Sequence, residues 1–168
     1  MSLRRASRGS AGSGERIPRH DGVHAHALAV ELLRSMDGTL DRNEALSLAR
    51  RAFAEYMIGY YSDVLRDTRP RTQVRFDAFR RHYEAYASRR DYIDIVSSDA
   101  RTLSVRYRRC PFHELLASRG IDHYTACFCA ADIAFTEACL PGVRFERNHE
   151  IATDGAPCDH TWRLDSVE

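Results

Sequence analysis

The sequence has 168 residues, of which 43% are hydrophobic and 10% aromatic, so its length and composition predict one folded domain rather than a disordered chain. The 25 basic residues nearly balance the 24 acidic ones, and this net charge of +1 argues against nucleic acid as the main partner. Every basic residue is an arginine. Schiff-base chemistry, a lysine general base and a lysine-bearing phosphate loop are therefore excluded.

The sequence also predicts where the protein is found. No apolar run approaches the ~18–20 residues that cross a bilayer, and no apolar stretch follows the N-terminal arginines as it does in a secretory signal. We therefore expect a cytoplasmic protein without membrane contact. Thiols stay reduced in that compartment, so the odd count of five cysteines favours buried packing, metal ligation or nucleophilic catalysis over disulfides.

The first half of the chain predicts a disordered tail followed by helices. Residues 1–22 are rich in Arg, Gly and Ser, and residues 23–168 are expected to form the single domain. Apolar residues at helical spacing predict a first helix over 23–36. Asp41 is the predicted cap of a long second helix that carries an apolar stripe to Val64. Aromatic residues at positions 76, 79, 83 and 86 predict a third helix.

The second half changes to an alternating pattern and predicts a sheet. Residues 92–97 and 103–109 are typical of a β-hairpin. Cys110-Pro111 predicts the start of a short helix, and Asp122 the cap of a longer helix that ends at Cys139. A second hairpin is predicted from strands 143–151 and 158–164. These elements predict an α+β fold, with helices packed on a small antiparallel sheet built from two hairpins.

Alternation in the final hairpin predicts which side chains point inward. If residues 152–157 form the connecting loop, the opposite partners are Ile151 and Cys158, His149 and His160, Arg147 and Trp162, and Phe145 and Leu164. The polar members of this inner face are Arg147, His149, Cys158 and His160. Buried polar groups cost roughly 1–3 kcal/mol when unpaired, so these four predict partners or a ligand.

The preceding helix offers such partners. Asp132 interrupts its apolar stripe, and Cys129 lies one turn away on the same side. Burial would raise the pKa of this aspartate, as a general base at neutral pH requires. We expect one pocket between this helix and the final hairpin, lined by Cys129, Asp132, Arg147, Cys158 and His160.

Two other interpretations of the same residues stay open. Asp132 and Arg147 would also satisfy each other as a purely structural ion pair. Cys129, Asp132, Cys158 and His160 would also provide two chelating pairs for one zinc ion, although no cofactor is otherwise predicted. The remaining thiols of Cys127 and Cys139 are expected to be buried apolar groups.

Several dispersed residues in this region stand in an order that resembles a known family. The residues that carry the resemblance are Cys110-Pro111, Cys129-x-x-Asp132, Phe145-x-Arg147, Ile151-Ala152, Gly155 and Cys158-Asp159. Over Cys110 to Leu164, about the C-terminal third, the chain is similar to the L-2-amino-thiazoline-4-carboxylic acid hydrolase family. It departs from the family pattern at His160, where an aromatic residue is expected, and at Asp154, where a small residue is commoner.

The resemblance implies a hydrolase, or a related biosynthetic enzyme, that opens a small cyclic amidine or thiazoline carboxylate. In this hypothesis Asp132 is the general base and His160 donates a proton or orients the reactants. Arg147 and His149 bind the substrate, with the arginine on its carboxylate. Direct attack by Cys129 or Cys158 is a second route that the sequence leaves open. The alternatives to an enzyme are a non-catalytic module that binds an apolar carboxylic acid, and a protein-interaction partner.

Overall fold

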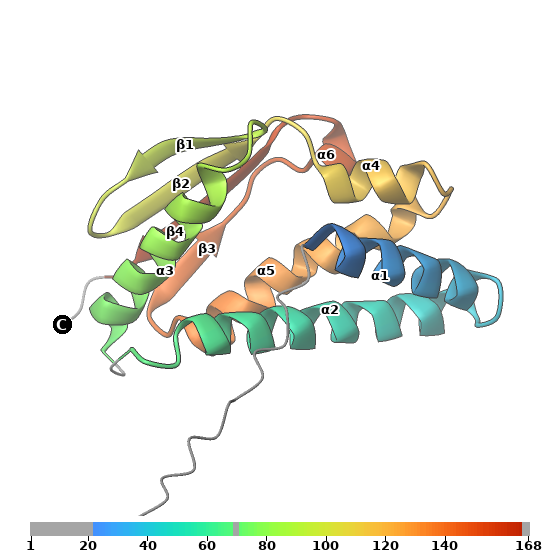
Figure 1. Cartoon of the computed structure of the whole chain (residues 1–168), viewed down its shortest axis with the longest axis horizontal. Helices are drawn as coiled ribbons and strands as arrows, with labels where there is room; N and C mark the ends of the chain where they lie inside the picture. The colour runs from blue at the N-terminus through green and yellow to red at the C-terminus, as the bar shows by residue number, and fades with distance from the viewer. Residues whose placement is uncertain (1–21, 69–70, 166–168) are drawn as a thin grey trace, which may run out of the picture.

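The computed structural model describes residues 22–68 and 71–165 (Figure 1). The predicted tail over residues 1–22 lies outside this range except for Gly22, which is the first residue of helix α1. Within the described residues, no helix combines the length and the apolar character needed to cross a membrane.

Three helices begin the fold, as the spacing of apolar residues predicts. They are α1 (Gly22–Asp37), α2 (Arg42–Val64) and α3 (Thr72–Ala87). The predicted cap of α2 is confirmed, because the Asp41 carboxylate accepts hydrogen bonds from the backbone N–H groups of Asn43 (2.9 Å) and Glu44 (3.4 Å). These bonds satisfy two of the amide groups that a helix start leaves without partners.

The helices of the second half are α4 (Pro111–Ala117), α5 (Thr125–Cys139) and the short α6 (Ile151–Asp154). Cys110 is the residue before α4, and its Sγ accepts the backbone N–H of His113 at 3.4 Å. The prediction that Asp122 caps α5 is wrong. Asp122 lies in a separate 3₁₀ turn, η1 (Asp122–Tyr124), and α5 begins only after that tighter turn.

The α+β prediction is confirmed, with a sheet whose four described strands are all antiparallel. They are β1 (Ile93–Ser98), β2 (Thr102–Tyr107), β3 (Val143–Glu146) and β4 (Cys158–Leu164). Their order is β1-β2-β4-β3, so the last strand, β4, lies inside the sheet and pairs with β2 on one side and β3 on the other. One face of the sheet packs against α3 and α5.

The predicted register of the final pair is wrong by two residues. Phe145 lies opposite Trp162, whereas the sequence predicts Leu164 as its partner. A shift of two keeps every side chain on the same face, so the inward face of β4 is as expected. The predicted pairs that include Arg147, His149 and Ile151 do not form, because β3 ends at Glu146.

The chain leaves the sheet after Glu146 because the Asp159 carboxylate binds the backbone of the residues that follow. Asp159 Oδ1 accepts the backbone N–H groups of Asn148 (2.8 Å) and His149 (2.7 Å). Asp159 Oδ2 also accepts the Asn148 side-chain amide at 3.0 Å. These bonds replace ladder hydrogen bonds, so the segment turns away and forms α6 where the sequence predicts a longer strand.

Two clusters of buried apolar side chains stabilise the fold. The sheet cluster joins α3, the inner face of the sheet and the second half of α5; its largest buried members are Phe76, Phe79, Leu103, Val105, Phe135 and Trp162. The helix cluster joins α1, α4 and the first halves of α2 and α5 through Val30, Leu33, Phe112, Leu116, Tyr124 and Cys127. Helices α2 and α5 run along each other through both clusters (Figure 1).

The turn between α5 and β3 gives a first testable prediction. Gly142 has a φ of +80°, and a Cβ added there would lie 3.0 Å from Cγ2 of Thr72. Gly142→Ala should therefore lower the free energy of unfolding by about 1–2 kcal/mol. Gly59, within α2, has nothing within 4 Å of its Cβ position, so Gly59→Ala should raise it by about 0.5–1 kcal/mol. Denaturant unfolding of both variants checks the prediction, which is contradicted if the two changes have the same sign.

Candidate functional site

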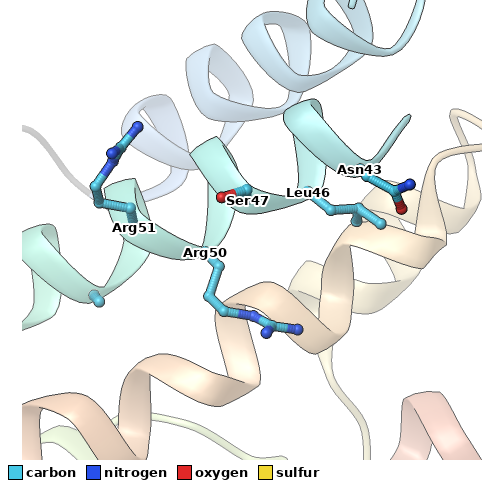
Figure 2. Close-up of a pocket in the computed structure, with 6 residues that line it drawn as sticks. Asn43, Leu46, Ser47, Arg50 and Arg51 are labelled. Atoms are coloured by element: carbon cyan, nitrogen blue, oxygen red, sulfur yellow. The ribbon is translucent and has the colours of Figure 1, made fainter. Parts of the chain in front are cut away.

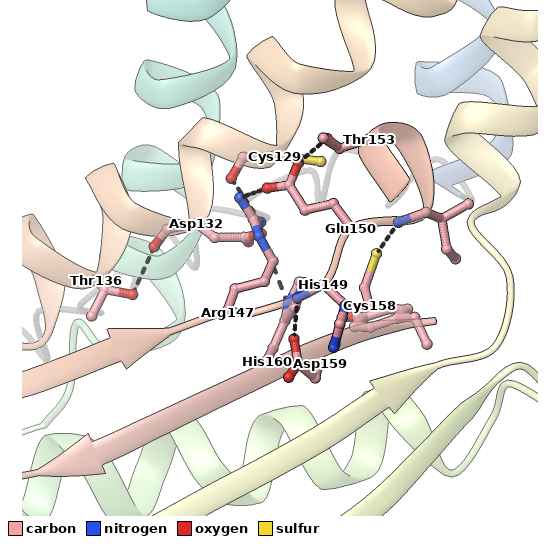
Figure 3. Close-up of polar contacts among 12 residues, drawn as sticks. Cys129, Asp132, Thr136, Arg147, His149, Glu150, Thr153, Cys158, Asp159 and His160 are labelled. Atoms are coloured by element: carbon pink, nitrogen blue, oxygen red, sulfur yellow. Dashed lines mark hydrogen bonds and ion pairs between the residues drawn. The ribbon is translucent and has the colours of Figure 1, made fainter. Parts of the chain in front are cut away.

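A polar cluster lies where α5, the residue after β3 and the first half of β4 come together (Figure 3). Arg147 Nη1 lies 3.2 Å from Asp132 Oδ2 and donates to the Cys129 carbonyl oxygen at 3.2 Å. His160 Nδ1 lies 3.9 Å from the same Asp132 oxygen. The structure therefore brings together Cys129, Asp132, Arg147 and His160 from three elements.

The local sequence explains why these side chains meet. Cys129 and Asp132 are one turn apart on α5, and His160 precedes the fully buried Trp162 by two residues on the inner face of β4. The Trp162 indole N–H donates to Thr136 Oγ1 at 3.0 Å. This bond holds α5 against β4 next to the site, and the Thr136 hydroxyl in turn donates to the Asp132 carbonyl oxygen within α5 at 2.7 Å.

The electrostatic state of Asp132 is unusual for a carboxyl group. Its side chain is 16% exposed, and burial raises its pKa to about 7. The positive charge of Arg147 opposes this shift, and the nearby Glu150 adds to it. Asp132 therefore exists as both carboxylic acid and carboxylate near neutral pH, which lets it accept and return a proton.

His160 is held as a neutral ring among aromatic side chains. Burial, with a smaller effect of the Arg147 charge, lowers its pKa to about 3. The ring centroids of Tyr107, Phe145 and Trp162 lie 5.0, 5.4 and 5.7 Å from that of His160. Its Nδ1 is buried without a hydrogen-bond partner and points toward Asp132. Because the ring is neutral, this 3.9 Å contact is not an ion pair.

The aromatic wall next to His160 is uncharged. The hydroxyl groups of Tyr83 and Tyr107 are hydrogen-bonded to each other. Burial raises the pKa of both phenols well above the usual value, so both keep their protons at neutral pH. The charge of the site therefore comes from the aspartate, the arginine and a third group, Glu150.

Glu150 is a site residue that the sequence pattern does not predict. Its Oε1 pairs with Arg147 Nη2, and its Oε2 accepts the Thr153 hydroxyl at 3.0 Å. Strand alternation places residue 150 on the outer face of a strand over 143–151, but the real chain turns inward after β3. Residues three apart approach each other only where the backbone is not extended. The spacing of Arg147 and Glu150 therefore indicates an ion pair once β3 ends at Glu146.

His149 is not placed with the other predicted site residues. Its side chain is exposed, and its Nδ1 lies 3.0 Å from Asp154 Oδ2. This contact raises the pKa of His149 and lowers that of Asp154. Asp154 thus partners His149 on the surface, away from Asp132.

Three thiols surround the site, and all of them are protonated at neutral pH. Burial raises the pKa of Cys110, Cys129 and Cys158. The Sγ of Cys158 accepts the backbone N–H of Ile151 at 3.2 Å, which holds the start of α6 against β4. A nucleophilic or metal-binding cysteine needs an environment that favours the thiolate, and burial here does the opposite.

The described residues contain no group of three His, Cys, Asp or Glu side chains arranged to hold a metal ion. The zinc alternative therefore gains no support from the geometry, and it stays a prediction that metal analysis of the purified protein tests.

Two surface pockets lie on different parts of the fold. One, of about 500 Å³, lies on the first half of α2 and is lined by Asn43, Leu46, Ser47, Arg50, Arg51 and Ala54 (Figure 2). The other, of about 350 Å³, lies between α5 and β3, and Thr136 and Phe145 are among its lining residues. The Phe145 ring also contacts His160, so only the second pocket adjoins the polar cluster.

Comparison with known families covers most of the chain. The sequence pattern of the family described as L-2-amino-thiazoline-4-carboxylic acid hydrolase matches residues 21–162. The sequence pattern predicts a resemblance over about the C-terminal third only. The match also includes the upstream helices, so the resemblance extends over most of the chain. A search of curated proteins finds no match. With the family pattern matched from α1 to β4, the chain belongs to the L-2-amino-thiazoline-4-carboxylic acid hydrolase family.

Proposed function

We propose that the protein is a hydrolase that opens a small cyclic amidine carboxylate, of which a 2-amino-thiazoline-4-carboxylate is the prototype. The observation that carries the proposal is the buried Asp132 carboxyl group, whose pKa of about 7 suits proton transfer at neutral pH. Its neighbours, a cationic arginine and a neutral histidine, fit the same chemistry. The family supplies the substrate class.

In the proposed reaction, water attacks the amidine carbon of the ring and a carbon–oxygen bond forms. Asp132 takes one proton from the water and passes it to the ring nitrogen. The carbon–sulfur bond then breaks as the new oxygen becomes a carbonyl, and the sulfur leaves as a thiolate that takes the second proton of the water. The product is a urea with a free thiol, and one water molecule is consumed for each ring opened.

His160 acts in this scheme as an orienting group rather than as a cationic acid. A pKa of about 3 keeps the ring neutral at the pH where Asp132 exchanges its proton. We propose that the water to be activated sits about 2.8 Å from both Nδ1 of His160 and Oδ2 of Asp132, bridging atoms that lie 3.9 Å apart. Such a water gives the buried Nδ1 a hydrogen-bond partner and lies beside the base that activates it.

The protonated thiols favour attack by water over attack by cysteine. We therefore expect Cys129→Ser and Cys158→Ser to keep most of the ring-opening activity, because neither sulfur forms a bond to the substrate. Serine at position 158 still accepts the Ile151 N–H, so the fold is retained. Loss of nearly all turnover in either variant, with native circular dichroism, would establish the covalent route instead.

The direct test is an assay of thiol release from L-2-amino-thiazoline-4-carboxylate by the purified protein, with and without a chelator. Turnover supports the proposal, and its loss on chelation would point to a metal. Thermal stabilisation by the carboxylate without turnover would instead favour the non-catalytic binding module.

A further inference from the structure

The two nitrogen atoms at the tip of Arg147 already have partners. Nη1 faces Asp132 and the Cys129 carbonyl oxygen, and Nη2 faces Glu150. The arginine side chain is only 9% exposed, whereas that of Glu150 is 24% exposed. The guanidinium is therefore enclosed by the protein on the Asp132 side and covered by a more accessible carboxylate on the Glu150 side.

This arrangement conflicts with simple addition of a carboxylate substrate. A third carboxylate beside Asp132 and Glu150 would leave up to three negative charges around one arginine, in a largely buried place where charge repulsion is poorly screened. The Nη2 atom of Arg147, which lies on the more accessible side of the guanidinium, is already paired with Glu150. A substrate carboxylate thus needs one of the two acids to leave.

Glu150 is the acid that is able to leave. Asp132 is fixed on α5, where its backbone carbonyl accepts the Thr136 hydroxyl. Glu150 instead precedes the four-residue α6, in a segment that Asp159 anchors through other residues. Its Oε2 already accepts the Thr153 hydroxyl, so a displaced Glu150 keeps one hydrogen bond and gains water for the rest.

We infer that Glu150 is a carboxylate of the protein's own that occupies the place of the substrate carboxylate on Arg147 and is exchanged for it on binding. The inference rests on the proposed function, because it names the group that the substrate replaces. Glu150 then determines specificity: only a ligand that carries its own carboxylate restores the partner that Arg147 loses. A neutral analogue does not replace that negative charge, so Glu150 stays paired with Arg147 and does not affect its binding.

The test measures binding of a ligand that cannot be hydrolysed. Thiazolidine-4-carboxylate has the ring and the carboxylate but no amidine carbon, and its 4-carboxamide has no charge at that position. Calorimetry should show that Glu150→Gln binds the carboxylate about fivefold more tightly than the wild type, and Glu150→Ala more tightly still, because each removes a competitor of the ligand. Affinity for the carboxamide should stay unchanged in both variants.

Glu146→Gln is the matched control. Glu146 lies nearby on β3 but pairs with the exposed Arg144 and Arg163, so its removal should leave both affinities unchanged. Equal or weaker carboxylate binding by the Glu150 variants overturns the inference, as does an equal gain for the carboxamide. The inference and the proposed function fail separately. Tighter carboxylate binding without any ring opening refutes only the proposed function, whereas ring opening with no gain in affinity refutes only the role of Glu150.

Discussion

Asp132→Asn should lower the rate of ring opening by at least ~100-fold, because asparagine keeps the shape of the side chain but neither takes nor returns a proton. The same substitution should make the folded protein more stable at alkaline pH. Burial raises the pKa of Asp132 to about 7, so the folded state ionises this group at a cost that the unfolded chain does not bear.

The sign of this stability effect follows from the direction of the shift. Below about pH 4 the carboxyl group is protonated in both states, and the wild type bears no cost. Between about pH 4 and pH 7 only the unfolded chain ionises, so the stability of the wild type falls as the pH rises. At pH 8 we expect the variant to be about 2 kcal/mol more stable than the wild type, since the full shift corresponds to about 4 kcal/mol and asparagine loses part of the attraction of Arg147.

Paired measurements of turnover and of urea unfolding at pH 4.5 and pH 8 test both effects. Asp63→Asn is the control, because Asp63 is an exposed residue of α2 that pairs with Arg66 far from the site. It should change neither turnover nor the pH dependence of stability. If Asp132→Asn retained wild-type turnover, the assignment of the base would be wrong.

His160→Phe should make the protein more resistant to acid. The pKa of His160 is lowered to about 3, so between pH 6.5 and pH 3 the unfolded chain binds a proton that the folded state excludes. The wild type therefore loses stability as the pH falls through this range. The variant keeps an aromatic ring among Tyr107, Phe145 and Trp162. On going from pH 7.5 to pH 4.5, its free energy of unfolding relative to that of the wild type should rise by about 2–3 kcal/mol.

His149→Gln provides a control with the opposite sign. The contact with Asp154 raises the pKa of His149, so its contribution is present at low pH and is lost as the pH rises through the folded value. The variant should lose stability relative to the wild type at pH 4.5 and match it at pH 7.5. The same acid response in both variants would show that neither histidine controls it.

The fold was largely predictable because its local signals agree with its tertiary contacts. Helical spacing of apolar residues, the Asp41 cap and the alternation in 158–164 each predict an element that the structure contains. The pairing of β2 with β4 was not predictable, because it joins segments more than 50 residues apart in the chain and no turn between them sets the register. The start of α5 was not predictable either, because the 3₁₀ turn moves the N-cap two residues along the chain, from Asp122 to Tyr124.

The site was predictable only where side chains follow a regular period. Cys129, Asp132 and His160 lie on a helix and a strand, and their spacing correctly places them on inward faces. The side-chain directions of residues 147–150 were not predictable in this way. The Asp159 carboxylate ends β3 early, so strand alternation no longer tells which of these side chains point inward. As a result His149 was expected inside and Glu150 outside, whereas the structure has the reverse.

The order of strands in the sheet has a consequence for how the protein folds during synthesis. The last described strand, β4, lies between β2 and β3, so no earlier strand pair joins the two halves of the sheet. Until residues 158–164 have been made, the β1–β2 hairpin exposes Leu103 and Val105 and has only two strands, which are marginally stable alone. For as long as its central strand is missing, a nascent chain therefore has only α3 to cover the apolar face of this hairpin.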